Sequence, residues 1–264
     1  MPSSTAQPSG VLLVGSIPLT TTEEVLSKVC SALHRRLRSI PDGEPGVRNS
    51  YIGWQLDCFP KETRDSILGV TAAELPPDHS GTFSLESVKE TQYDIAAPRG
   101  VRFQISLPSL LNSVRAHRIL ESLATIIEGI PAEDLAIQWD ICFEIFVLEH
   151  GRGRLPDALF KAYFASVLEG IVTRMQRLYK AVPSGIPLGL HLCYGNCRYT
   201  HFAEPQDLSL VVQLVNHITK AVDRPISWIH MPVPKDRDDS AYFEALSQLD
   251  AEMMRRVRTA ESCH

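Results

Sequence analysis

Short apolar runs alternate with longer segments of helical periodicity along most of the chain. Strands are predicted at residues 11–14, 36–40, 101–108, 135–144, 188–195 and 225–232. Helices are predicted at residues 23–37, 85–91, 112–129, 156–181, 207–221 and 241–258. Because neighbouring parallel strands need a crossover connection that is usually a helix, this alternation predicts an α/β fold with a parallel sheet.

The pattern contains about six strand–helix units, whereas a complete (β/α) barrel has about eight. We expect a TIM-barrel-like fold, truncated to about six units, as one domain over residues 11–258 between tails at 1–10 and 259–264. Residues 58–100 are interpreted as an insertion or lid-like loop region, or as surface padding. An open barrel exposes two sheet edges. We therefore expect a homo-oligomer or coverage by the N-terminal or 60–100 segments, with a truncated gene model as a third explanation.

Composition narrows the class of protein. The chain has 264 residues, of which 44% are hydrophobic, enough for one sizeable core. A net charge of −5 argues against a nucleic-acid-binding surface. No apolar run approaches the length of about 20 residues that spans a membrane. The first ten residues lack a signal peptide pattern, and the six cysteines show no disulfide framework, so we expect reduced thiols in the cytoplasm.

His191 and Cys193 are the most informative pair of side chains. They are two positions apart, so on a strand they point to the same face. Imidazole and thiolate groups together suit Zn²⁺, which binds nitrogen and sulfur ligands. The alternative is a buried strand with a small cysteine and a hydrogen-bonded histidine. Cys193 and Cys197 are a weaker redox pair, because their spacing is one residue longer than that of the thioredoxin-like motif.

Acidic side chains follow two of the predicted strands. Asp140 ends an otherwise apolar strand, where a buried charge needs a partner, unless the carboxylate is exposed or caps a loop. Glu44 and Arg48 lie in a turn rich in proline and glycine, which composition alone interprets as a solvated loop. Glu44 and Asp140 are the candidate acid–base groups. His201 is a further polar group near the site, or a surface histidine.

The chain resembles the superfamily of the cobalamin-independent methionine synthase catalytic domain and uroporphyrinogen decarboxylase. The His-x-Cys-Tyr sequence at residues 191–194 is similar to the zinc strand of methionine synthase. Three other segments are similar to family motifs at strand ends: Gly-Ser-Ile-Pro at 15–18, Gly-Glu with a following Arg-Asn at 43–49, and Ile-Gln-Trp-Asp at 137–140. The resemblance covers roughly residues 11–239.

The resemblance implies roles for residues at the ends of five strands. Ser16 would bind an amino acid substrate, Glu44 and Asp140 would hold its amino group, and Arg48 and Glu144 would complete the substrate site. The implied zinc ligands are His191, Cys193 and His230. The chain departs from the family at two of these strands. Ile141-Cys142 replaces Glu-Pro, and His230 replaces the zinc-binding glutamate. The seventh and eighth strands, the latter with its zinc-binding cysteine, have no counterpart.

These features predict an enzyme that acts on a small molecule, with a place in secondary metabolism expected from the resemblance. One chemistry is alkyl transfer to a zinc-bound thiolate, because zinc keeps a thiol deprotonated near neutral pH. Another is a repurposed lyase, isomerase or cyclase reaction in the same pocket. The alternative is a catalytically decayed barrel that binds a small molecule or stabilises a partner enzyme.

Overall fold

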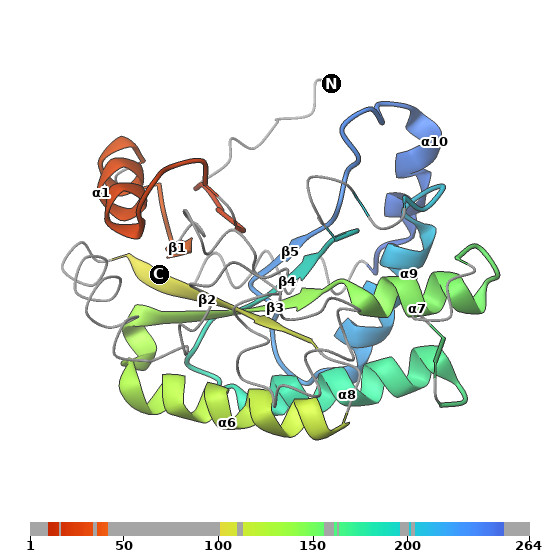
Figure 1. The fold of residues 1–264 in the computed structure, drawn as a ribbon, viewed down its shortest axis with the longest axis horizontal. Coiled ribbons are helices and arrows are strands. Elements are labelled where there is room, and N and C mark those ends of the chain that lie inside the picture. The colour runs from red at the N-terminus through yellow and green to blue at the C-terminus, as the bar shows by residue number, and fades with distance from the viewer. Residues whose placement is uncertain are drawn as a thin grey trace, which may run out of the picture. The chain divides into compact units, whose positions relative to one another are not determined.

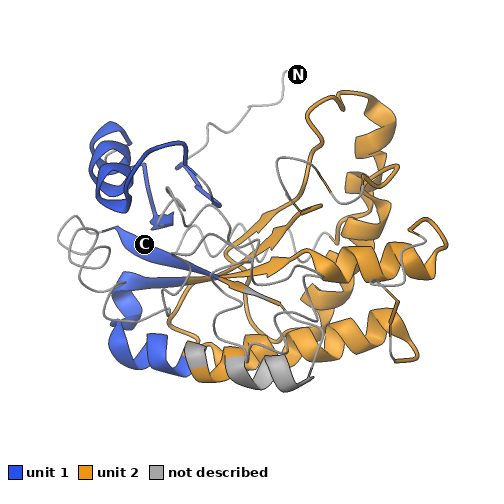
Figure 2. Ribbon diagram, in the orientation of Figure 1, with its two compact units in different colours: residues 1–106, 124–136 blue, residues 107–123, 137–264 orange. Residues whose placement is uncertain are grey.

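A computed structural model describes residues 10–15, 17–33, 36–41, 101–109, 113–155, 161–162, 164–195, 201 and 204–250. Three predicted substrate-binding residues, Ser16, Glu44 and Arg48, lie outside the described residues. The chain divides into two compact units (Figure 2): unit 1 contains residues 1–106 and 124–136, and unit 2 contains residues 107–123 and 137–264. Helices and strands alternate in the order that the α/β prediction requires (Figure 1).

Unit 1 contains the first strand pair of the sheet. Strand β1 (Ser39–Pro41) runs parallel to β2 (Arg102–Pro108). Unit 1 includes β2 as far as Ser106. Val11 forms a single parallel bridge with Leu37 rather than the strand predicted at residues 11–14. The parallel direction that the sequence predicts is therefore confirmed, although the first pairing is reduced to one bridge.

Helix α1 (Thr22–Ala32) supplies two of the four buried residues of the apolar cluster of unit 1. Leu26 and Cys30 lie one helical turn apart on its buried face, as the spacing of apolar positions predicts. They pack with Leu37, which precedes β1, and with Ile40, the middle residue of β1. The helix ends earlier than the predicted residue 37, because the chain must leave the helix before it enters the strand.

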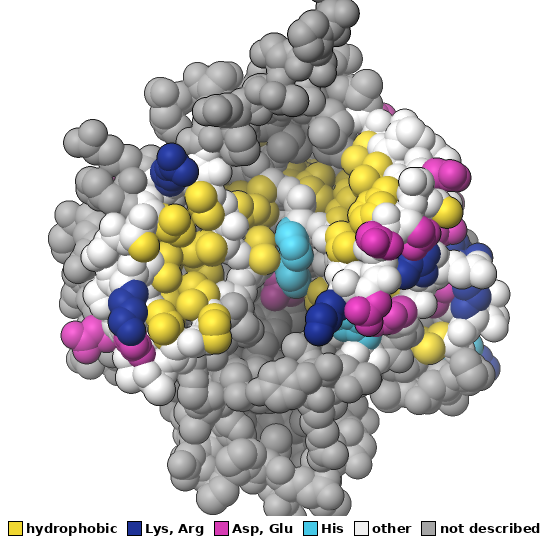
Figure 3. All heavy atoms as spheres, turned by 90° about the horizontal axis from the view of Figure 1, so that it is seen from above, with side chains coloured by type: hydrophobic (Ala, Val, Ile, Leu, Met, Phe, Trp, Pro, Cys, Tyr) yellow, Lys and Arg dark blue, Asp and Glu magenta, His cyan; other side chains and the backbone are white. Residues whose placement is uncertain are grey.

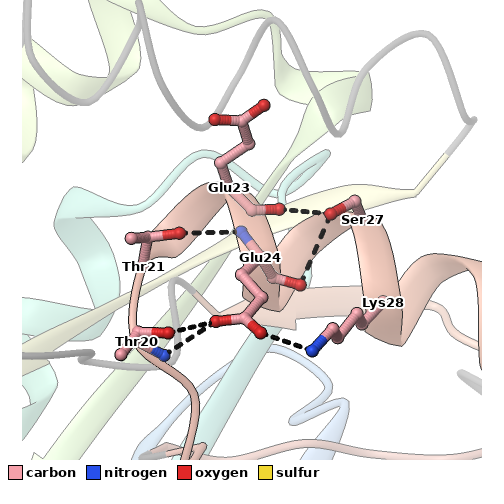
Figure 4. A network of polar contacts seen from close by, with 6 residues as sticks. All are labelled: Thr20, Thr21, Glu23, Glu24, Ser27 and Lys28. Atoms are coloured by element: carbon pink, nitrogen blue, oxygen red, sulfur yellow. Dashed lines mark hydrogen bonds and ion pairs between the residues drawn. The ribbon is translucent and has the colours of Figure 1, made fainter.

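The start of α1 is held by a reciprocal cap (Figure 4). The side chain of Thr21 accepts a 3.1 Å hydrogen bond from the Glu24 backbone N–H. The Glu24 carboxylate accepts from the backbone N–H and hydroxyl of Thr20 and pairs with Lys28 one turn later. The hydrogen bonds from Lys28 and Thr20 lower the pKa of Glu24 to about 2. Side-chain contacts of this kind satisfy backbone N–H groups at a helix start that have no partner within the helix.

Three parallel strands follow one another in unit 2. Strand β3 (Leu135–Ile141, from residue 137 in this unit) pairs with β4 (Leu188–Leu192), which pairs with β5 (Trp228–His230). The strands of the chain follow the order β1-β2-β3-β4-β5 in one sheet. Strands β3 and β4 are buried along nearly their whole length, as expected where a parallel sheet is covered on both faces.

Helices connect these strands. The helices are α6 (Ser113–Gly129), α7 (Phe143–Gly151), α8 (Val167–Ala181), α9 (Ser209–Ala221), α10 (Ser240–Phe243) and two 3₁₀ segments, Ala132–Asp134 and Glu244–Gln248. Helices α8 and α9 pack against each other, and α7 contacts both of them. The apolar positions that α8 buries include Ile171, Met175 and Leu178, as its period predicts.

The largest difference from the sequence prediction lies after β3. The strand ends at Ile141, and helix α7 begins at Phe143, so Glu144 lies in the first turn of a helix rather than at a strand end. The apolar run continues from strand into helix, and periodicity alone cannot distinguish a buried strand from a buried helix there. The helix predicted over 241–258 is described as α10 and a 3₁₀ segment that ends at Gln248.

Basic and acidic side chains are interspersed among the described residues of the face in Figure 3, together with apolar and histidine side chains. Among the described residues, no helix combines the length and the apolar character that crossing a membrane requires.

Candidate functional site

Polar side chains on one face of β3, β4 and β5 form three successive layers. In the first layer Gln138, Gly189 and Trp228 are register partners. In the second layer Asp140, His191 and His230 occupy matching positions. Residues that match in register and are two apart along a strand point to the same face, so the two layers line one surface. That surface leads to the carboxyl ends of the parallel strands, where active sites of α/β folds are built.

The next positions along the chain add a third layer. Ile141 and Leu192 are the last register partners of β3 and β4, and Cys142 and Cys193 are the residues that directly follow them. The backbone N–H of Cys193 donates a 3.1 Å hydrogen bond to the carbonyl of Ile141, which continues the parallel pairing past the end of the strands. Both thiols are free and partly exposed. The cysteines therefore lie directly beyond the Asp140 and His191 layer.

Trp228 joins the first layer across the middle strand. Its indole N–H donates a 3.1 Å hydrogen bond to Oε1 of Gln138, two strands away. The ring passes over Gly189, where a Cβ atom would lie only 1.9 Å from the indole carbon Cε2. Gln138 in turn donates a 2.9 Å hydrogen bond from Nε2 to Oδ1 of Asp140. The first layer thus orients the carboxylate of the second.

His191 and His230 meet through their ring nitrogens. The two Nδ1 atoms are 2.9 Å apart, while the ring centroids are 4.9 Å apart and the ring planes differ by 3°. Nitrogens so much closer than the ring centres indicate rings that meet edge to edge rather than face to face. One Nδ1 carries the proton that the other accepts, so the pair shares a single proton at this contact. Burial and the neighbouring His191 both lower the pKa of His230.

The sulfur of Cys193 collects three hydrogen-bond donors. The Cys142 thiol, the His191 ring and the backbone N–H of Gly195 all donate to it, and in this order they lower the pKa of Cys193 well below its usual range. Gly195 has a φ of 71°, a left-handed conformation that glycine adopts without strain and that turns its N–H back toward the sulfur. Burial acts in the opposite direction but does not prevail. Of the two cysteines, Cys193 is the one whose thiolate form these contacts favour.

Cys142 has the opposite character. Its hydrogen bond to Cys193, followed by burial, raises its pKa well above the usual value, so it remains the thiol donor. Cys142 is the residue immediately before α7. The thiolate and its donor thus come from the ends of neighbouring strands. Two cysteines that are 51 positions apart in the sequence, 142 and 193, are brought together by the register of the sheet.

Glu144, in the first turn of α7, adds a buried carboxyl group next to Ser109. It is only 2% exposed, and burial raises its pKa to about 8, against an ordinary value of 4.5. Oγ of Ser109 is 2.9 Å from its Oε1 and 2.8 Å from the backbone oxygen of Asp140. A serine hydroxyl has one proton to donate. Ser109 is the donor in both contacts, so its one proton is shared between Glu144 Oε1 and the Asp140 carbonyl.

Unit 2 brings together five of the eight predicted site residues: Asp140, Glu144, His191, Cys193 and His230. The polar contact of His201 is not with these layers: its Nδ1 atom lies 2.6 Å from a carboxylate oxygen of Glu204.

Within the described part of the chain, no group of three or more histidine, cysteine or acidic residues is arranged to hold a metal ion. The zinc site expected at His191, Cys193 and His230 therefore stays a prediction.

Residues of the site that were not predicted include Cys142, Ser109 and Trp228. The signal for Cys142 was present in the sequence, since it follows one buried strand as Cys193 follows the next. Ser109 also follows a strand directly. The role of Trp228 depends on the space above Gly189, and no pattern in the sequence reveals that space.

The chain was compared with family models, curated proteins and solved structures, and none of them matches it.

Proposed function

We propose that this chain is an enzyme that acts on a small molecule with the Cys193 thiolate as its nucleophile. The observation that carries the proposal is the set of donors on one sulfur atom, Cys142, His191 and Gly195, at the carboxyl ends of parallel strands. A thiolate is the reactive form of cysteine, and donors or positive charge nearby maintain it at neutral pH. A purely structural cysteine needs none of these contacts.

The surrounding groups support a covalent reaction. Cys193 attacks an electrophilic carbon of the substrate, and a carbon–sulfur bond forms as the bond to the leaving group breaks. Glu144, with a pKa of about 8, retains its proton at neutral pH and could therefore serve as a general acid near the site. Asp140 is oriented by Gln138 and suits a hydroxyl or amino group of the substrate. Group transfer and elimination reactions both fit this arrangement.

A (β/α) barrel of the methionine synthase type stays our proposal for the complete fold. Its support is the parallel order of the strands and the gathering of polar side chains at their carboxyl ends. Alkyl transfer to a thiolate is the reaction that the resemblance favours. The present proposal assigns the nucleophile to the protein's own Cys193 and routes no step through a metal.

Reactivity of Cys193 toward iodoacetamide tests the proposal. The reduced protein is treated at about pH 6.5, where an ordinary thiol, with a pKa of about 8.5, is almost entirely protonated. Peptide mass spectrometry follows each cysteine over time. We expect Cys193 to react about ten-fold or more faster than N-acetylcysteine, because it is already a thiolate. Buried Cys30, 5% exposed, is the internal control and is expected to react last.

Replacing the donors separates a polarised thiolate from a merely accessible one. His191→Gln removes a donor and a potential positive charge beside Cys193, and we expect several-fold slower alkylation at the same pH. His217→Gln is the matched control, because His217 binds the Gln213 carbonyl within α9, away from these layers. A wild-type Cys193 that reacts no faster than N-acetylcysteine would contradict the proposal and favour a non-catalytic binding protein.

A further inference from the structure

Cys142 and Cys193 lie next to each other just beyond the paired ends of β3 and β4. They directly follow the register partners Ile141 and Leu192, and the hydrogen bond from Cys193 N–H to the Ile141 carbonyl holds the two chain segments at strand spacing. Neighbouring strands lie about 4.8 Å apart, within the range of about 4.4–6.8 Å over which Cα atoms of a disulfide are found. The thiols also contact each other through a hydrogen bond. Both are partly exposed and free.

We propose that Cys142 and Cys193 form a reversible disulfide by exchange with a low-molecular-weight disulfide, and that this bond turns the site off. The inactivation rests on the proposed function, since the bond would occupy the sulfur that acts as nucleophile. The formation of the disulfide rests only on the placement of the two residues. By sequence position, Cys193 was paired only with Cys197, as the weaker redox pair.

The exchange balances with one disulfide molecule as oxidant. The Cys193 thiolate attacks one sulfur of R–S–S–R, the sulfur–sulfur bond of that molecule breaks, and one thiolate RS⁻ leaves. Cys142 then attacks the Cys193 sulfur of the mixed disulfide and displaces the second RS⁻, which takes the Cys142 proton. The first RS⁻ takes the proton that Cys193 had released to solvent. Two protein thiols are oxidised by two electrons, and R–S–S–R is reduced to two thiols.

Oxidised glutathione is the probe that tests the disulfide. The full chain is reduced, freed of reductant and incubated with the probe, and remaining thiols are then alkylated. Digestion with chymotrypsin, which cleaves after Tyr194, separates Cys193 from Cys197 for mass spectrometry. We expect a peptide pair joined through Cys142 and Cys193, and a loss of Cys193 alkylation of about ten-fold or more that dithiothreitol reverses.

Three variants give matched comparisons. Cys142→Ser is expected to stop at a stable glutathione adduct on Cys193, and Cys142→Ala provides a second form if the serine variant does not fold. Cys197→Ser is expected to form the disulfide as the wild type does. A Cys193–Cys197 bond, a lasting glutathione adduct in the wild type, or no reaction of Cys142 would overturn the proposal.

The outcomes also separate this inference from the proposed function. If the disulfide forms but reduced Cys193 reacts no faster than N-acetylcysteine, the nucleophile is refuted and the redox pair stands. If reduced Cys193 is highly reactive but no bond to Cys142 forms, the nucleophile stands and the redox pair is refuted.

Discussion

The indole N–H of Trp228 reaches across strand β4 to Oε1 of Gln138, at 3.1 Å. The contact is possible because the position between them in register is Gly189. Gln138 in turn donates a 2.9 Å hydrogen bond from Nε2 to Oδ1 of Asp140. A residue without a side chain on the middle strand therefore determines how a carboxylate on the next strand is oriented.

Gly189→Ala is expected to displace Trp228, because the new Cβ would lie 1.9 Å from the ring. Overpacking of this kind costs about 1–3 kcal/mol of unfolding free energy. Urea unfolding measures the loss, and a changed tryptophan fluorescence maximum reports the displaced ring. Gly185→Ala is the control, since a Cβ atom added there would meet nothing within 4 Å, and it is expected to change stability little.

Glu144→Gln is expected to stabilise the protein in alkaline solution. The pKa of Glu144 is raised from 4.5 to about 8 in the fold, so the stability that its protonated form contributes is complete below pH 4.5 and is lost as the pH rises through about 8. Glutamine keeps the shape of the protonated acid but does not ionise. Urea unfolding of both proteins should show nearly equal stability at low pH and a gain for the variant on the order of 5 kcal/mol near pH 9. A difference that does not change with pH would refute the raised pKa.

Tyr242→Phe is expected to cost more stability than Tyr194→Phe. The Tyr242 hydroxyl donates to the Pro232 carbonyl at 2.9 Å and lies 2.8 Å from the Tyr194 hydroxyl. Removing it breaks both buried contacts, for about 1–3 kcal/mol, whereas removing the Tyr194 hydroxyl breaks one, for about 0.5–1.5 kcal/mol. Thermal or urea unfolding of the two variants and the double variant measures the difference. Equal losses would show that the Pro232 contact adds nothing.

Arg224→Met is expected to destabilise the turn between α8 and β4. The guanidinium donates to the carbonyls of Val182 at 2.6 Å and Ile186 at 2.7 Å, and so ties the two ends of this turn together. The loss of both hydrogen bonds should cost about 1–3 kcal/mol by urea unfolding. Arg177→Met, at an exposed position of α8, is the matched control and should be near neutral. Equal stability of the two variants would show that the turn does not depend on Arg224.

The alternation of strands and helices was predictable because it depends on local periodicity. The buried faces of α1 and α8, and the cap at Thr21, follow from residue types at fixed spacing. The boundary at Cys142 was not predictable, because the apolar run from β3 continues into α7 without a change that periodicity can detect. Register decides that boundary, since pairing with β4 ends where α7 begins.

The sequence by itself determined that His191 and Cys193 share a face and that Asp140 follows the core of a strand, because side-chain direction alternates along any strand. Only the tertiary structure decided their partners. The register of β3, β4 and β5 aligns Asp140 with both histidines, turns the two Nδ1 atoms together and brings Cys142 beside Cys193. Register depends on contacts between residues far apart in the chain, and burial, which protonates Glu144, depends on everything packed around it.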